Sequence, residues 1–278
     1  MKFRTEIEPL RTDITIAHSD AVVMLGSCFT DNISALMLRD GFNVVANPMG
    51  VLYNPVSIAK LICRATENRL YSLEDLVQTP DGIWHCLDYN THYQNADKEA
   101  LLVALNADLT AFAEALQRAS IVIITLGTAY VYTHLQTANT VGNCHKIPAR
   151  EFSRNRLSLA EATDCITRIC DMLKGKRVIL TVSPIRHLAD GLHGNNLSKA
   201  ILHLGIDAAG ADYFPAYEAL CDDLRDYRFY ANDLKHPAEM AVTYIYELFA
   251  QSYFSQDTQA QALAFRAAAA RKAHRPIL

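Results

Sequence analysis

The sequence predicts an α/β fold, a three-layer α/β/α sandwich around a mostly parallel five-stranded sheet. Two observations carry this prediction. Several short runs are continuously apolar and rich in Val and Ile, which is typical of strands that are covered on both faces. Segments with apolar residues at helical spacing separate these runs, and strands that alternate with helices pair in parallel through right-handed crossovers.

Five strands are expected along the chain. The first four are strongly apolar and the fifth is weaker. They cover residues 21–29, 42–46, 120–127, 176–183 and 227–231.

The expected helices lie between these strands. Residues 97–118 place six large apolar side chains at helical spacing, and a second helix follows Ser158, which forms a capping box with Glu161. Further helical patterns cover 195–209 and 237–254, and a helix-like stretch follows residues 26–32. We therefore expect one domain over residues 1–254. The Ala-, Gln- and Arg-rich tail at 255–278 is expected to be helical or frayed.

Four segments interrupt this alternation and contain much of the histidine and asparagine of the chain. They are residues 47–57, 80–95, 133–157 and 183–196. Long loops in a compact domain are usually functional or disordered. We interpret them as the walls of one site.

Composition narrows the class of protein. The formal net charge of -4 gives no basis for nucleic-acid binding. The seven cysteines are scattered without a CxxC pair, which is typical of reduced cytosolic thiols rather than of disulfides or a zinc site. No histidine spacing matches a metal site, and we expect neither a metal nor another cofactor. Without an apolar leader or a stretch of bilayer length, a cytoplasmic location and no membrane association are expected. The sequence does not indicate an oligomeric state.

The strand end at residues 26–28 is the first candidate for chemistry. A buried strand that ends in Gly-Ser-Cys before a helix delivers Ser27 or Cys28 to the carboxyl edge of the sheet. Free N–H groups of the helix and its dipole favour negative charge there. We therefore expect a lowered pKa for a cysteine thiol at this point, more so with an imidazolium nearby.

A candidate base lies near the other end of the chain. In Asp-Leu-Lys-His-Pro, the carboxylate of Asp233 can reach Nδ1 of His236 and leave Nε2 facing the end of the first strand. Pro237 is expected to open the last helix at its first turn. A surface pair or a structural cap is the alternative interpretation of these two residues.

Several separated motifs carry a resemblance to a known family. The segment 25–31 resembles the first sequence block of the GDSL or SGNH hydrolases, and Asp-x-x-His-Pro resembles their last block. Six motifs together resemble the GSCFA-domain proteins, a branch of that superfamily. They are Gly-Ser-Cys-Phe (26–29), Asn-Pro-x-Gly-Val-Leu-Tyr-Asn-Pro (47–55), Leu-Gly-Thr-Ala (126–129), Asn-Cys-His-Lys (143–146), Ser-Pro-x-Arg-His (183–187) and Gly-Asn-Asn-Leu-Ser-Lys-Ala (194–200).

The resemblance implies a flavodoxin-like strand order and roles for individual residues. It places Cys28 where the superfamily has its serine nucleophile, with His236 as general base and Asp233 as its orienter. The N–H groups of Cys28 and Gly50 would stabilise the oxyanion. The oxyanion asparagine of the third block is missing here, where the sequence reads Gly-Thr-Ala, so Thr128 or Asn143 is a candidate substitute.

The implied activity is hydrolysis of an ester or acyl bond, with a small-molecule or glycan acyl ester as substrate and carbohydrate deacylation as one form. Acyl transfer to another acceptor is the nearby variant, and a catalytically silent scaffold that binds a glycan or acyl ligand is the alternative. Ser27 competes with Cys28 as nucleophile, and a simply buried Cys28 thiol is the third interpretation. The candidate substrate-binding residues are Arg186, His187, His85 and Tyr53. For Arg186, a salt bridge that fixes a loop and a site for a substrate carboxylate or phosphate remain equal alternatives.

Overall fold

The central sheet has five strands, all paired in parallel, in the computed structural model, which describes residues 4–273. Its strands are β1 (Ala21–Gly26), β2 (Asn43–Ala46), β6 (Ile121–Leu126), β10 (Arg177–Val182) and β11 (Asp212–Tyr213). Their order is β11-β10-β6-β1-β2, which is the flavodoxin-like order. The predicted fold class is confirmed.

The prediction of the fifth strand at residues 227–231 is wrong. Residues 227–231 do not join the sheet, and Tyr227–Phe229 form a short 3₁₀ helix, η5. The Asp226 carboxylate accepts a hydrogen bond from the N–H of Arg228 at 2.8 Å, which turns the chain locally and prevents an extended conformation. The sheet is completed instead by the two-residue strand β11, which is too short to be recognised from apolar periodicity.

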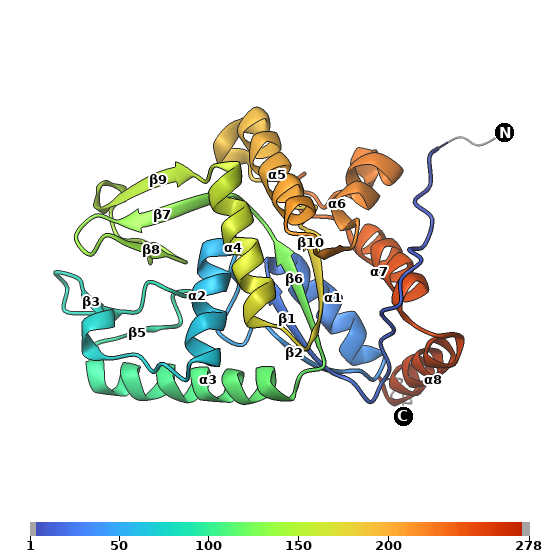
Figure 1. Ribbon diagram of the computed structural model, residues 1–278, viewed down its shortest axis with the longest axis horizontal. Helices are drawn as coiled ribbons and strands as arrows, with labels where there is room; N and C mark the ends of the chain where they lie inside the picture. The colour runs from blue at the N-terminus through green and yellow to red at the C-terminus, as the bar shows by residue number, and fades with distance from the viewer. Residues whose placement is uncertain (1–3, 274–278) are drawn as a thin grey trace, which may run out of the picture.

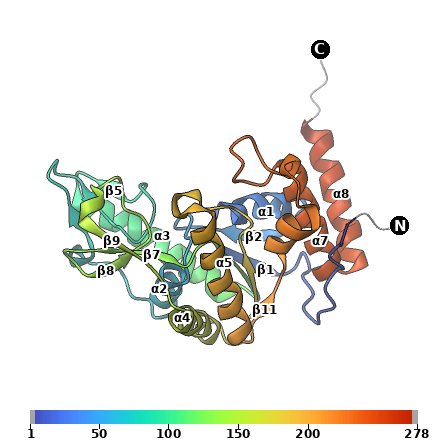
Figure 2. The ribbon, with the colours of Figure 1, turned by 90° about the horizontal axis from the view of Figure 1, so that it is seen from above.

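Helices cover both faces of the sheet (Figures 1 and 2). One layer contains α2 (Pro55–Thr66), α3 (Lys98–Arg118), α4 (Leu159–Met172) and α5 (Gly191–Ala208). The other contains α1 (Cys28–Arg39), α7 (Glu239–Tyr253), α8 (Gln256–Ala273), α6 (Ala216–Glu218) and the π-helix η4 (Ala219–Leu224). Along β1, Val23 and Leu25 face the first layer while Val22 and Met24 face the second, as the period of two in a strand requires.

Several helix ends follow from the sequence. The capping box of Ser158 and Glu161 opens α4 as expected. The helix α5 begins at Gly191, four residues earlier than the expected start at 195. Pro237 does not open α7, because the helix begins at Glu239 with Ala238 as its N-cap. Pro237 instead forms an isolated bridge with Tyr230.

The described part of the tail is the helix α8, packed beside α1. Arg266 forms a bidentate ion pair with Asp40, whose side chain is 1% exposed and also accepts a hydrogen bond from Tyr246. The last part of the predicted tail, 274–278, lies outside the described residues. None of the described helices, α8 included, is long and apolar enough to cross a bilayer.

Two small antiparallel sheets lie at the end of the molecule opposite α8 (Figures 1 and 2). One contains β3 (Val77–Gln78), β4 (Trp84–His85) and β5 (Gln94–Asn95), preceded by the 3₁₀ turn η1 (Leu73–Asp75). The other contains β7 (Tyr130–His134), β8 (Asn139–Val141) and β9 (Phe152–Arg156), with the turns η2 (Ala149–Glu151) and, further along the chain, η3 (Leu188–Asp190). The sequence did not predict these strands, which are only two to five residues long.

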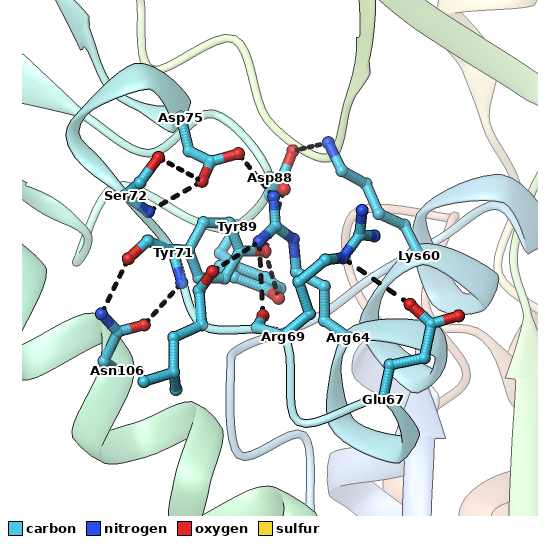
Figure 3. A network of polar contacts seen from close by, with 11 residues as sticks. Lys60, Arg64, Glu67, Arg69, Tyr71, Ser72, Asp75, Asp88, Tyr89 and Asn106 are labelled. Atoms are coloured by element: carbon cyan, nitrogen blue, oxygen red, sulfur yellow. Dashed lines mark hydrogen bonds and ion pairs between the residues drawn. The ribbon is translucent and has the colours of Figure 1, made fainter.

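A buried polar network anchors the first small sheet to α2 and α3 (Figure 3). The Arg64 guanidinium lies 3.7 Å from the ring centroid of Tyr71 and pairs with Asp75 at 2.5 Å. The Tyr71 hydroxyl donates to Asp88 at 2.9 Å, and Asn106 of α3 binds both backbone groups of Tyr71. These contacts hold the segment between α2 and β4 in one place.

Candidate active site

The strand end at β1 turns sharply into α1. Gly26 has φ +138°, and a Cβ there would lie 2.2 Å from the carbonyl oxygen of Thr125, so only glycine fits between the two strands. Ser27 follows as the N-cap of α1, and Cys28 is the first helical residue. The turn therefore presents consecutive side chains in different directions.

Ser27 points into the protein. Its side chain is buried, donates a hydrogen bond to Oγ of Ser183 at 3.0 Å, and accepts one from the N–H of Phe29 at 3.3 Å. The structure thus engages the Ser27 hydroxyl beneath the strand ends rather than with His236.

The Cys28 thiol lies next to the imidazole of His236. The distance from Cys28 Sγ to His236 Nε2 is 3.6 Å, and the distance from His236 Nδ1 to Asp233 Oδ2 is 2.5 Å. The other carboxylate oxygen of Asp233 accepts hydrogen bonds from the N–H groups of Lys235 and His236, both at 3.0 Å. The spacing Asp-x-x-His therefore closes a compact turn that fixes the carboxylate against the imidazole.

These contacts determine where the protons lie. The N–H and imidazole of His236, followed by the N–H of Lys235, hold the pKa of Asp233 well below its usual range, so the carboxylate only accepts. Nδ1 of His236 must therefore carry a proton, and in neutral imidazole this leaves a lone pair on Nε2 toward the Cys28 thiol. Burial raises the pKa of Cys28, against the opposing effect of the N–H groups of Cys28 and Phe29. The expected lowering of this pKa is wrong, because desolvation outweighs the helix terminus.

A cavity of about 410 Å³ opens at Cys28 and His236. Its walls come from the ends of the parallel strands and from the sheet β8-β7-β9. Besides Cys28 and His236 it is lined by Tyr53, Asn54, Thr128, Tyr130, Tyr132, Val141, Gly142, Arg154, Ile185, Arg186, His187, Leu188, Ala189, Asp190 and Lys235. Three of the four segments predicted as walls contribute, and 80–95 does not.

His85 does not line the cavity at Cys28. It lines a separate cavity of about 590 Å³ beside the first small sheet. Its Nδ1 lies 3.0 Å from Nδ1 of His145, and its Nε2 lies 3.0 Å from the Thr79 hydroxyl. Among the four residues predicted to bind substrate, the structure brings Tyr53, Arg186 and His187 to Cys28, but not His85. No group of three or more potential metal ligands occurs within residues 4–273.

The predicted oxyanion donors are mostly engaged elsewhere. The N–H of Gly50 donates to the carbonyl oxygen of Asn47 at 2.7 Å. Asn143 does not line the cavity; its N–H donates to Leu87 and its side chain accepts from His145. Thr128 lines the cavity, but its N–H donates to Tyr53.

Asn54 is a donor that the sequence did not predict. It is buried, lines the cavity and caps α2 by accepting a hydrogen bond from the N–H of Ser57 at 2.9 Å. This contact identifies the capping atom as Oδ1, so Nδ2 carries the two N–H donors, for which residues 4–273 provide no hydrogen-bond acceptor. The motif 47–55 contained this asparagine directly before Pro55, a typical cap-and-proline helix start that could have identified it.

One face of α5 supports the site from below. Lys199 is fully buried and donates to the carbonyl oxygens of Gly127 and Ser183, both at 2.7 Å. Ser198 binds the Thr128 hydroxyl, and Asn195 accepts from the N–H of His187. Lys199 shares the buried face of α5 with Leu202 and Ile206, and this helical spacing could have shown that it is buried.

The fold and this site define the class of protein: a doubly wound α/β/α domain with a thiol, an imidazole and a carboxylate in line at the carboxyl edge of its sheet. The GSCFA family model matches residues 21–249. The chain therefore belongs to the GSCFA family. No curated protein matches the sequence.

Proposed function

We propose that this protein is an acyl hydrolase that uses Cys28 as nucleophile, His236 as general base and Asp233 to orient the base. The observation that carries the proposal is the chain of contacts from Cys28 Sγ to His236 Nε2 at 3.6 Å and from His236 Nδ1 to Asp233 at 2.5 Å. A nucleophile in contact with a base that a third group orients is the arrangement required for covalent acyl transfer.

The raised pKa of Cys28 favours a neutral thiol at rest, so the proton moves during attack. As Sγ bonds to the acyl carbon, the thiol proton passes to Nε2 of His236, and the imidazolium is stabilised by Asp233. His236 then protonates the leaving oxygen. In the second half, water attacks the thioester and gives one proton to Nε2 of His236. The C–S bond then breaks, His236 returns the proton to Cys28 Sγ, and a carboxylic acid leaves. Acyl transfer to another hydroxyl differs only in the acceptor.

The oxyanion in this scheme is held by the N–H of Cys28 and by Nδ2 of Asn54. The first lies at the N-terminus of α1. The second belongs to a buried side chain in the wall of the same cavity, oriented by its cap on α2. Asn54 would thereby replace both Gly50 and the asparagine that the third block lacks. We further assign the protein to the SGNH superfamily on its motifs and its strand order.

Thiol labelling and ester hydrolysis test the nucleophile. Hydrolysis of 4-nitrophenyl butyrate should be lost in Cys28→Ala and reduced at least ~10²-fold in His236→Ala. Cys165→Ser is the matched control, because Cys165 is also a half-buried free thiol but lies on α4. Full activity in Cys28→Ala, or Cys28 alkylation that proceeds equally fast without His236, would rule out the cysteine mechanism.

Asn54→Ser tests the oxyanion donor. Serine keeps a cap for α2 and removes the amide, so the melting temperature should change little while kcat falls about 10²–10³-fold. Asn143→Ser is the control outside the cavity. Equal activity of the two variants would exclude Asn54 from the oxyanion hole.

The second candidate is a catalytically silent scaffold that binds a glycan or acyl ligand. The engaged N–H of Gly50 and the raised pKa of Cys28 favour it. Ligand binding without any turnover, in a protein whose Cys28 alkylation does not depend on His236, would establish this alternative.

A further inference from the structure

Two arginines line the cavity and are held in the same way. The Cζ atom of Arg154 lies 4.1 Å from the ring centroid of Tyr130, and that of Arg186 lies 4.2 Å from the ring centroid of Tyr230. A second tyrosine ring lies 5.3 Å from each guanidinium. Such stacking fixes the plane of a guanidinium, whose edge N–H groups then point in defined directions toward an anion.

The two arginines differ in charge compensation. Arg154 forms an ion pair with Asp190, whose side chain is only 2% exposed. Arg186 forms no ion pair with a carboxylate among residues 4–273, and the rings of Tyr230 and Tyr227 lie beside its guanidinium. The alternative that Arg186 fixes a loop through a salt bridge therefore has no support within the described chain.

Arg186 is tied to the loop that carries the base. The backbone N–H of Arg186 donates to the carbonyl oxygen of Lys235 at 3.2 Å, one residue before His236. The carbonyl oxygen of His236 accepts from the N–H of Ala231 at 2.8 Å, next to the stacking residue Tyr230. The guanidinium thus has a defined position relative to the imidazole, in the same cavity.

Most of the charged side chains in the cavity wall are cationic. Arg154, Arg186 and Lys235 are positive, and Asp190 alone is negative. Asp190 is paired with Arg154, and the Asp233 carboxylate is bound to His236. Arg186 and Lys235 are therefore the cationic side chains of the wall that form no ion pair among residues 4–273. The volume of about 410 Å³ is in the range of small-molecule sites.

We propose that Arg186 binds an anionic group, a carboxylate or a phosphate, carried by the substrate. The substrate class is then an acyl ester with a negative charge on its acyl or its alcohol part. That the substrate contains an ester rests on the proposed function. That it carries a negative charge rests on the Arg186 guanidinium, which forms no ion pair among residues 4–273.

Binding without turnover is tested by protection of Cys28 from iodoacetamide, followed by mass spectrometry of its peptide. Glutarate or butyl phosphate should slow alkylation of the wild type severalfold, while neutral glutaramide should not. Protection should disappear in Arg186→Gln and persist in Arg150→Gln, an exposed arginine outside the cavity. The anion that protects Cys28 more strongly shows whether the site prefers a carboxylate or a phosphate. Equal protection in wild type and Arg186→Gln, or none by either anion, would overturn the proposal.

Turnover of a matched ester pair separates this proposal from the proposed function. The ratio of kcat/KM for 4-nitrophenyl hemiglutarate over 4-nitrophenyl butyrate should fall about 10- to 100-fold in Arg186→Gln and stay constant in Arg150→Gln. If both esters are hydrolysed but the ratio is unchanged, the anion site is refuted and the hydrolase stands. If neither is hydrolysed but anions protect Cys28 through Arg186, the site stands and the hydrolase is refuted.

Discussion

The hydroxyl of Ser27 donates to Oγ of Ser183 at 3.0 Å, which joins the end of β1 to the end of β10 beneath the cavity. Because Ser27 also caps α1, it has a structural function of its own. Ser27→Ala should lower the free energy of unfolding by about 1–2 kcal/mol, measured by urea denaturation. The Cys28 alkylation rate should stay within about twofold of wild type. A large loss of Cys28 reactivity with unchanged stability would contradict this separation.

Gly26 is expected to be intolerant of any side chain. Gly26→Ala places a methyl group 2.2 Å from the Thr125 carbonyl oxygen, so the two strands must separate. We expect a loss of more than about 3 kcal/mol in unfolding free energy. Gly82→Ala is the control, since Gly82 also has positive φ but nothing lies within 4 Å of its added Cβ, and it should cost only about 1–2 kcal/mol. Similar losses in both variants would show that conformation, not contact, limits Gly26.

Lys199 should make stability depend on pH. Burial lowers its pKa to about 7 from an ordinary value of 10.5. Between these values the unfolded chain binds the proton and the folded protein does not, so the stability of wild type rises with pH. Relative to Lys199→Met, wild type should gain up to about 1.4 kcal/mol per pH unit between pH 7 and 9 in urea denaturation. The other titratable groups are the same in both proteins, so their effects cancel in the comparison. A difference in unfolding free energy that does not change with pH would contradict the prediction.

Arg154 and Asp190 should be strongly coupled. Arg154→Gln leaves a buried carboxylate in the cavity wall, so we expect a loss of about 1–3 kcal/mol in unfolding free energy. Asp190→Asn should recover part of this loss when combined with Arg154→Gln. A double-mutant cycle by urea denaturation should give a coupling of at least about 1 kcal/mol, whereas additive losses would show that the pair is weak.

Much of the central fold could be predicted because its strands are covered on both faces. Continuous apolar runs identified β1, β6 and β10, and the capping box located the start of α4. Strand β11 and the two small sheets carry no comparable periodicity. Their strands are short and mostly polar, so tertiary contacts such as the network around Arg64 determine them (Figure 3).

The candidate site could be predicted where a local turn defines it. The Asp233 turn and the β1 end place their side chains through contacts within a few residues. Arg154 reaches the cavity only through the packing of β9, which no local pattern encodes. For Asn54 the local pattern indicates a helix cap, but its place in the cavity wall depends on the packing of α2. The pKa of Cys28 was mispredicted for a related reason, since burial depends on the surrounding loops.

The loop from Tyr227 to Pro237 carries both the imidazole and the aromatic ring on which Arg186 rests, and the bridge between Tyr230 and Pro237 closes it into one unit. A hinge motion of this loop would displace the base and the arginine platform together. Under the proposed function, anion binding and ester cleavage would therefore be coupled: a conformer that withdraws His236 from Cys28 would also move the Tyr230 ring away from the Arg186 guanidinium.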